Sequence, residues 1–225
     1  MKAMILAAGR GERMKPLTDS CPKPLLKIAG MPLIEHLIRK LVAAGITEIV
    51  INHAWLGEQI VQYLGNGQQF GAVIEYSAES EGALETAGGI IQALPLLGNE
   101  PFLVINGDVY TDFDFTHLPQ LTKETLAHLW LVNNPEHNLN GDFYLLNKTV
   151  SNNYIKQSQA YTFSGIGLYR PDFFNGDRGT NTVLPLAPML RKAIDDNAIS
   201  AELLAEFWAD IGTPQRLQEL NNQLQ

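Results

Sequence analysis

The stretch MILAAGRGERMKPLTDSCPKPLL, residues 4–26, limits the possible folds of this chain more than any other part of the sequence. It begins with a short apolar run that is typical of a buried strand and passes at once into a glycine-containing loop. Gly9 and Gly11 permit backbone angles and close approaches that side chains would prevent, so several N–H groups can point at one anion. We therefore expect a strand followed by a loop that binds phosphate.

Fixed positive charge in the same stretch supports phosphate as the ligand. Arg13 and Lys23 follow the glycines, and the prolines on either side of Lys23 stiffen the segment that carries it. The two common phosphate motifs are absent, because GRGERM lacks the third glycine of GxGxxG and no GxxxxGK[ST] occurs. The plain alternative is an ordinary strand and turn with charged surface residues.

Length and composition indicate one globular domain. The chain has 225 residues, of which 45% are hydrophobic and 18% charged. The net charge of -8 argues against a nucleic-acid partner. The absence of a membrane-spanning apolar run or a signal-peptide pattern, together with a single cysteine, favours a cytoplasmic protein without a membrane partner.

Charge is distributed unevenly along the sequence. Residues 1–27 contain six Lys and Arg side chains, whereas residues 41–122 contain none. A cationic loop that faces an acidic middle section suits a ligand made of phosphates and a divalent metal.

The hydrophobic pattern predicts an α/β fold. We expect helices over 32–44, 56–64 and 85–94, the last ending before Pro95, and strands over 46–52, 72–77 and 101–106. This alternation is typical of a Rossmann-like, mostly parallel sheet with helices on both faces, in which ligands bind at the carboxyl ends of the strands.

Beyond residue 115 the alternation weakens. Strands are expected over 127–133 and 161–169, a hairpin or loop over 150–159, a helix over 183–195 interrupted by two prolines, and a closing helix over 214–224. Residues 199–207 have helix-forming side chains. We divide the single domain into a nucleotide-binding half, about 1–115, and an acceptor-binding half, about 116–225.

Two aspartates follow apolar segments at positions suited to metal binding. Asp108 comes directly after the strand predicted over 101–106, and Asp210 lies in the segment WADIGTP. Carboxylate oxygens are the ligands that Mg²⁺ prefers. For Asp210 the alternative is a helix cap ahead of Pro214.

The ordered motif LAAGxGxRMxPLT followed by PKPL resembles the signature of the sugar-nucleotidyltransferase family, whose members join a nucleoside triphosphate to a sugar 1-phosphate. The resemblance implies that Arg13, Lys23 and Asp108 are catalytic, that Asp108 and Asp210 hold Mg²⁺, and that residues 199–207 form a strand. It further implies nucleotide-binding roles for Ala8, Gly9, Gly11, Glu12, Arg13, Lys23, Asn52, Ala54, Glu79, Gly82 and Asn106. Glu79 would accept the N3–H of a uracil or thymine ring, although a solvated loop is the alternative for this residue.

Further segments resemble one subgroup of this family, which transfers UMP from UTP to N-acetylmuramate 1-phosphate in peptidoglycan recycling. These segments are INHAWLG, LET at 84–86, NPEHNLNGDF and TFSGI. They imply that Glu85, Asn140, Asp142, Gly165 and Asp210 bind the sugar substrate, and that the partners are the small molecules UTP and a sugar 1-phosphate. The sequence does not fix the oligomeric state, for which a monomer is slightly favoured.

The chain departs from the family at the acceptor side. No EKP segment occurs between Asp142 and Phe163, which leaves open the cation that binds the acceptor phosphate; Lys156 is one candidate. Two other functions remain open. One is a thymidylyl- or cytidylyltransferase that acts on another phosphorylated acceptor, and the other is a non-catalytic nucleotide-binding regulator of the same fold.

Overall fold

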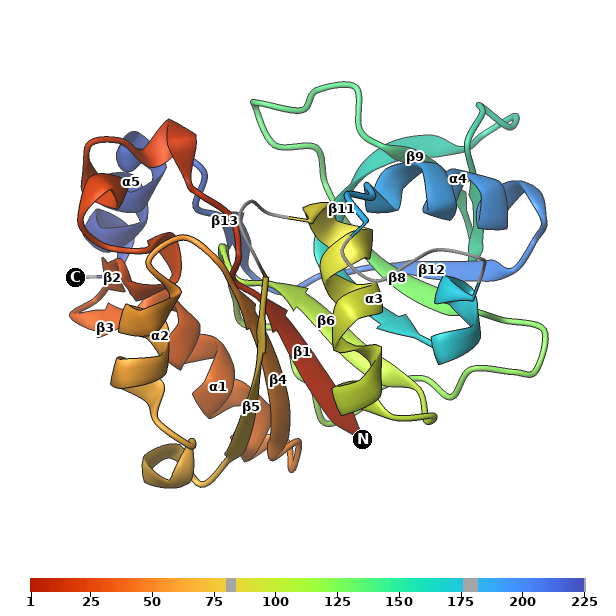
Figure 1. Cartoon of the computed structure of the whole chain (residues 1–225). Helices are drawn as coiled ribbons and strands as arrows, with labels where there is room; N and C mark the ends of the chain where they lie inside the picture. The colour runs from red at the N-terminus through yellow and green to blue at the C-terminus, as the bar shows by residue number, and fades with distance from the viewer. Residues whose placement is uncertain (80–83, 176–181, 225) are drawn as a thin grey trace.

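The computed structural model describes residues 1–79, 84–175 and 182–224 (Figure 1). Its first half contains the predicted parallel strands β1 (Lys2–Leu6), β4 (Glu48–His53), β5 (Val73–Ala78) and β6 (Phe102–Asn106), in the order β5-β4-β1-β6. The central residues of β1, β4 and β6 are apolar and buried, as expected for strands that are covered on both faces, whereas β5 is the edge strand and alternates between exposed and buried residues. The predicted residue Gly82 lies outside the described residues.

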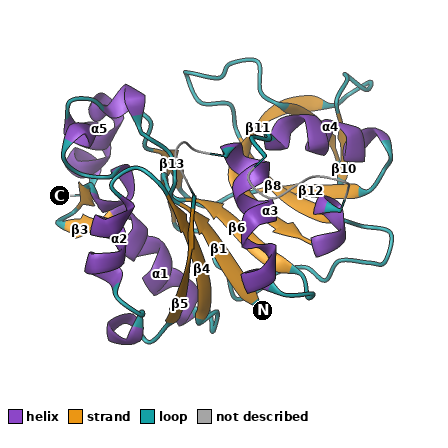
Figure 2. Cartoon of the chain, viewed as in Figure 1, coloured by secondary structure: helices purple, strands orange, loops and turns teal. Residues whose placement is uncertain are grey.

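Helices cover both faces of this sheet (Figure 2). On one face, α1 (Leu33–Ala43) and α2 (Gly57–Leu64) pack against Ala3 and Ile5. On the other face, α3 (Glu85–Leu97) packs against Met4, and α4 (Leu186–Asp195) lies beside α3 over the second half of the sheet. Successive residues of β1 therefore point into opposite cores, as the two-residue period of a strand requires.

The second half is not parallel, so the expectation of a mostly parallel sheet is wrong. The sheet continues through β11 (Gln159–Tyr169), β8 (Ala127–Val132), β12 (Ile199–Leu203), β10 (Thr149–Ser151) and β9 (Phe143–Leu146). Among these strands only β8 and β12 are parallel neighbours, and β9 also pairs with β11, which closes the group into a small barrel. The links from β9 to β10 and from β10 to β11 contain no helix, and parallel neighbours need a longer crossover.

Two local predictions also need correction, and one is confirmed. Helix α3 continues through Pro95 to Leu97, because Ala93 and Leu97 are buried in the core and this packing outweighs the lost hydrogen bond. Helix α4 is not interrupted, since Pro188 lies in its first turn, where the N–H would have no partner within the helix. Residues 199–203 form β12, as the family resemblance implied, because pairing with β8 overrides their helix propensity.

The C-terminal segment returns to the glycine loop (residues 7–20). Strand β13 (Trp208–Asp210) pairs with β7 (Val109–Thr111), and the predicted closing helix is α5 (Pro214–Gln223). Ile211 and Leu220 share a small core with Met14 and with residues around the hairpin of β2 (Lys27–Ile28) and β3 (Met31–Pro32). Figure 1 shows α5 beside this N-terminal segment. Packing at the end of the chain thus brings residues 210–216 to the glycine loop.

In the described part of the chain, no helix has both the length and the apolar character needed to cross a bilayer.

Candidate active site

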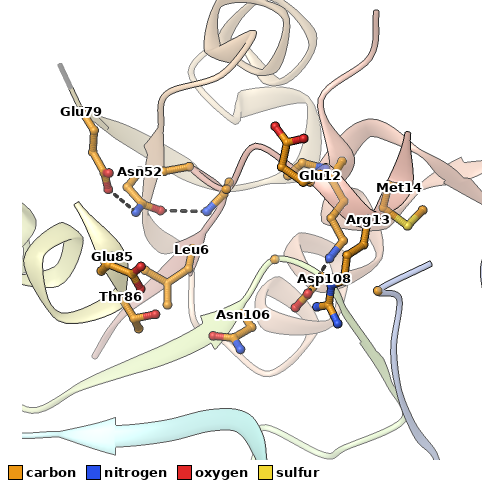
Figure 3. A pocket seen from close by; sticks show the side chains of 18 residues that line it. Leu6, Glu12, Arg13, Met14, Asn52, Glu79, Glu85, Thr86, Asn106 and Asp108 are labelled. Carbon is orange, nitrogen blue, oxygen red and sulfur yellow. Dashed lines mark hydrogen bonds and ion pairs between the residues drawn. The ribbon is translucent and has the colours of Figure 1, made fainter. Parts of the chain in front are cut away.

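A cleft of about 400 Å³ opens at the carboxyl ends of β1, β4 and β6. It is lined by Leu6, Ala7, Ala8, Gly9, Gly11, Glu12, Arg13, Met14, Lys23, Pro24, Asn52, Glu79, Glu85, Thr86, Asn106, Gly107, Asp108 and Gly212. Figure 3 shows two walls, with Asn52, Glu79, Glu85 and Thr86 on one side and Arg13 and Asp108 on the other. The cleft therefore separates a cationic wall from a wall of neutral and acidic polar groups.

The glycine loop is held in one shape by contacts from its own residues and from the β4–α2 connection. Gly11 has φ 66°, and a Cβ there would lie 3.0 Å from Thr18 Cγ2. The Thr18 hydroxyl donates to the Gly11 carbonyl at 2.8 Å, and the Thr18 carbonyl accepts from Arg10 Nη1 at 2.9 Å and from the Trp55 indole N–H at 3.0 Å. The Arg10 guanidinium also stacks 3.7 Å from the centre of the Trp55 ring. A loop fixed in this way loses little entropy when it binds an anion.

Lys23 and Asp108 meet on the cationic wall although they are far apart in sequence. Lys23 Nζ lies 2.6 Å from Asp108 Oδ2, and both side chains are largely buried, at 14% and 28% exposure. The turn after β6 reaches this position because Gly107 N–H donates to the Leu6 carbonyl at 2.8 Å, where a Cβ would collide. Arg13 points along the same wall in Figure 3, and no described residue bonds to its side chain. Two cations and one carboxylate thus surround the space beyond the glycine loop.

Asp210 lies next to Asp108, although it is not among the lining residues. Strand β13 places Asp210 opposite Val109, and Ile211 N–H donates to the Asp108 carbonyl at 2.8 Å. The Asp210 carboxylate accepts from Arg216 Nη1 at 2.6 Å on both oxygens and lies 3.2 Å from His137 Nε2. Asp210 is therefore an ion-pair partner on a strand, and it does not cap α5, where the Thr213 hydroxyl fills that position.

The two aspartates offer a donor set suited to Mg²⁺. The described residues contain no group of three or more His, Cys, Asp or Glu side chains that would enclose a metal by themselves. Mg²⁺ commonly binds one or two carboxylates and completes its shell with water and substrate phosphates. Each carboxylate has a cationic partner in this structure, Lys23 for Asp108 and Arg216 for Asp210. Asp108 and Asp210 fit this ion.

On the opposite wall, Asn52 and Glu79 form a directed hydrogen-bond chain. Asn52 Oδ1 accepts from the Ala7 N–H at 2.8 Å, Asn52 Nδ2 donates to Glu79 Oε1 at 2.6 Å, and Glu79 Oε2 accepts from the Leu84 N–H at 2.7 Å. Glu79 is only 7% exposed, so it is not a solvated loop residue. A Cβ on Gly89 of α3 would lie 2.5 Å from Glu79 Oε1, so this close packing needs a glycine. Both oxygens of the expected base acceptor are thus already engaged.

Two of the residues expected to bind nucleotide or sugar, Glu85 and Asn106, line the cleft, and a third, Gly165, packs behind Asn106 without lining it. Glu85 has φ 61°, an unfavourable value for a non-glycine residue, and it lines the cleft with Thr86 at the start of α3. Asn106 ends β6 at the cleft floor, and Gly165 of β11 packs against it, since a Cβ there would lie 2.5 Å from Asn106 Nδ2. Strain of this kind often occurs at binding sites.

The segment of residues 133–142, which we call the acceptor loop, is ordered by its own polar side chains. Asp142 accepts from the Phe163 N–H at 2.8 Å and from Asn138 Nδ2 at 3.2 Å. Asn140 is exposed, and neither Asn140 nor Asp142 lines the cleft. Ala54 also lies outside the lining residues, in the turn beside Trp55.

Sequence reasoning did not single out Arg216 and His137, which contact Asp210. His137 lies within the acceptor-side motif, and Arg216 carries no local signal because its position depends on the packing of α5. Thr86 and Gly212 also line the cleft, and each lies inside a motif that was recognised. Cys21 does not line the cleft, and burial raises the pKa of its thiol.

Comparison with known proteins places this architecture in a family. Residues 2–141 match the family model described as nucleotidyl transferase. The N-acetylmuramate alpha-1-phosphate uridylyltransferase of Neisseria meningitidis serogroup B is 55% identical over 223 residues, with 97% of this chain and 96% of that protein covered. A mannose-1-phosphate guanyltransferase of Hypocrea jecorina is 31% identical over 231 residues, with 95% of this chain and 61% of that protein covered.

Solved structures agree with the fold. The crystal structure of a putative glucose-1-phosphate thymidylyltransferase from Bacillus anthracis, in complex with a sucrose, superposes with a TM-score of 0.83 at 25% identity, covering 99% of this chain and 94% of that one. HddC from Yersinia pseudotuberculosis complexed with GMP-PN has a TM-score of 0.78 at 20% identity, covering 100% and 99%. Because the family model matches residues 2–141 and a relative is 55% identical over nearly the full length of both proteins, the chain belongs to the nucleotidyl transferase family.

Proposed function

We propose that this chain is a uridylyltransferase that transfers UMP from UTP to N-acetylmuramate 1-phosphate, giving UDP-N-acetylmuramate and pyrophosphate. The observation that carries the proposal is the 55% identity, over nearly the whole of both chains, to a protein with that named activity. The cleft supports it, because its cationic wall and its polar wall offer separate places for phosphates and for a nucleoside and sugar. The whole chain would act as one domain, with the acceptor bound by the second half.

The reaction needs positioning and charge stabilisation. An oxygen of the sugar 1-phosphate forms a bond to the α-phosphorus of UTP, and the bond from that phosphorus to the bridging oxygen of pyrophosphate breaks. The attacking oxygen is already ionised at neutral pH, so no general base is required. The difficulty is to bring two polyanions together, which fixed cations and oriented N–H groups achieve.

The cationic wall would hold the triphosphate. Gly9, Gly11, Arg13 and Lys23 line this wall, where the N–H groups of the glycines and the two cationic side chains would bind the phosphates. Asp108 and Asp210 would hold Mg²⁺, which when bound supplies positive charge to the transferring phosphate group. Lys23, which pairs with Asp108 in this structure, would then be available to the phosphates.

The polar wall would bind the uridine and the sugar. Asn106, Glu85 and Thr86 have side chains at the cleft surface, where they can bond hydroxyl or ring polar groups. Asn52 and Glu79 would act mainly by positioning the backbone at Ala7 and Leu84, because their polar atoms bond to each other and to those N–H groups. The acceptor loop and Gly165 would shape the sugar side.

The test is pyrophosphate release with Mg²⁺, crossing UTP, dTTP, CTP, ATP and GTP against the 1-phosphates of N-acetylmuramate, N-acetylglucosamine and glucose. Selective turnover of UTP with the muramyl sugar is the expected result. Turnover of another pair would keep the chemistry and change the substrates. Nucleotide binding without pyrophosphate release from any pair would contradict the proposed enzymatic activity and would favour a non-catalytic nucleotide-binding regulator.

A further inference from the structure

We propose that Arg216 binds the phosphate of the acceptor and takes the place of the lysine that the missing EKP segment would supply. This inference rests on the proposed function, since it concerns the second substrate of the same cleft. It starts from the cations that the structure places around the two aspartates.

The lysines of the acceptor half do not reach the cleft. Lys148 and Lys156 lie between Asp142 and Phe163, where an EKP lysine is expected, and both are exposed. Neither lines the cleft, and neither makes an ion pair with a residue that the structure describes. A different cation must therefore meet the acceptor phosphate next to Asp108 and Asp210.

Arg216 is placed for this task by helix α5. It is the third residue of α5, where its N–H donates to the N-cap Thr213 hydroxyl at 3.3 Å, and its side chain is only 21% exposed. The guanidinium lies over Gly212, a lining residue of the cleft. A Cβ on Gly212 would collide with Arg216 Nη2 and would lie 3.0 Å from Arg216 Cζ.

The guanidinium still has donors to offer. All of its described polar contacts use Nη1, which bonds to Asp210 at 2.6 Å and lies 3.1 Å from both ring nitrogens of His137. Nε and Nη2 have no partner within residues 1–79, 84–175 and 182–224. An arginine fork presents five N–H donors in a plane, so one edge can hold Asp210 while the other binds an oxyanion.

A second guanidinium converges on the same point. Arg13 Nη2 lies 3.5 Å from the position that a Cβ on Gly212 would occupy. Two like charges at one glycine repel each other unless an anion lies between them. Arg13 belongs to the glycine loop, and Arg216, from the neighbouring helix α5, contacts His137 of the acceptor loop. We assign the nucleotide phosphates to Arg13 and the acceptor phosphate to Arg216.

The test compares Arg216→Gln and Arg216→Lys with wild-type protein and with Arg191→Gln. Arg191 is an exposed arginine on α4 that does not line the cleft, and its guanidinium lies 5.4 Å from the centre of the Phe143 ring, so its variant controls for the loss of one partly packed arginine. Circular dichroism and thermal unfolding check that each variant is folded. Kinetics are measured by pyrophosphate release at saturating Mg²⁺, varying UTP and the acceptor separately.

We expect Arg216→Gln to raise the KM for the acceptor about ten- to hundredfold, the usual effect of losing a charged hydrogen bond, with the KM for UTP within about twofold of wild type. Arg216→Lys should recover part of the acceptor binding because it keeps the charge and loses the fork. An unchanged acceptor KM, or equal increases for UTP and acceptor, would overturn the proposal.

N-acetylmuramate without its phosphate identifies the group that Arg216 binds. This sugar keeps the lactyl carboxylate and should compete with the acceptor. If Arg216 binds phosphate, its inhibition constant is the same for wild type and Arg216→Gln. A parallel loss of inhibition would show that Arg216 binds the carboxylate and would refute the assignment to phosphate.

A calorimetric titration separates this inference from the proposed function. If another sugar 1-phosphate is the true acceptor, the same KM comparison applies to it, since the phosphate is common to all acceptors. If no acceptor is turned over, binding of inorganic phosphate is compared by calorimetry in the presence of UTP. Weaker phosphate binding by Arg216→Gln, but not by Arg191→Gln, would support the site, and equal binding would overturn it.

Discussion

Replacing Glu79 with glutamine tests whether this residue positions the cleft or reads the base. The chain of bonds through Asn52 and Glu79 ends in a backbone N–H on each side, at Ala7 and at Leu84. Asn52 must therefore present its oxygen to Ala7 and its NH₂ to Glu79, and Glu79 must accept with both oxygens. A glutamine has only one oxygen, so in either orientation of its amide one of the two donors faces another donor.

The expected loss of stability follows from the burial of these hydrogen-bonded side chains. Asn52 and Glu79 are 3% and 7% exposed, so water cannot replace the lost acceptor. A buried donor without a partner costs about 1–3 kcal/mol, and the two bonds to the carboxylate, at 2.6 and 2.7 Å, are of the stronger, charge-assisted kind. We expect Glu79→Gln to lower the free energy of unfolding by about 2–3 kcal/mol. For a chain of this size that lowers Tm by roughly 4–12 °C.

Glu79→Gln should also weaken the binding of UTP. Leu84 precedes Glu85 and Thr86 in the cleft, and Ala7 begins the glycine loop, so loosening either end should raise the KM for UTP. Thermal unfolding followed by circular dichroism and pyrophosphate release, measured well below the Tm of the variant, give the two quantities. Glu206→Gln is the control, because Glu206 is exposed and its substitution should change stability by less than about 0.5 kcal/mol. Loss of UTP binding with an unchanged Tm would refute the positioning role and favour a direct bond from Glu79 to the base.

Three further results are expected. Asp108→Asn removes the carboxylate that pairs with Lys23 and should lower kcat at least about a hundredfold; pyrophosphate release at a near-normal rate from a folded variant would remove Asp108 from the mechanism. Trp55→Phe keeps an aromatic ring that can stack on Arg10 but loses the indole N–H bond to the glycine loop, so the KM for UTP should rise about two- to tenfold. An unchanged KM would show that the loop is fixed without this bond. Burial lowers the pKa of His128, so below about pH 6.5 the unfolded chain takes up a proton that the folded chain does not, and the free energy of unfolding should fall as the pH drops from 7.5 to 5. Urea titrations should show a smaller fall for His128→Gln than for wild type. An equal fall in the two proteins would show that other groups cause the pH dependence.

Local sequence patterns were sufficient for the parallel half of the fold. Apolar runs bounded by glycine, asparagine or proline predicted β1, β4, β5 and β6, and the helical spacing predicted α1 and α2 to within a few residues. The barrel could not be predicted in this way, because its closure depends on β9 pairing with β11, and β9 is a four-residue strand without a clear pattern. Strand pairing between distant segments is a tertiary effect that propensity does not contain.

The same contrast applies to the cleft residues. Asp108 and Lys23 were recognisable because each lies in a motif with a defined neighbour in sequence, and the structure brings them to 2.6 Å. Arg216 was not recognisable in the sequence, because it is brought to Asp210 by the packing of α5 on a small core. This core consists of Met14, Ile28, Leu33, Ile211 and Leu220. A charged residue on an otherwise polar helix has no local feature that separates it from a solvated surface side chain.

The glycines show why a cleft is harder to predict than a loop. Gly9 and Gly11 are recognisable because their spacing in sequence indicates a turn around an anion. Gly89, Gly165 and Gly212 have a different use, since each leaves space for a polar side chain that comes from another element: Glu79, Asn106 and Arg216 respectively. An added methyl group at any of the three would displace a group that faces or supports the cleft, so these positions should tolerate alanine poorly although none of them is a predicted turn. The walls of the cleft are thus set by pairs of residues that only the folded chain brings together.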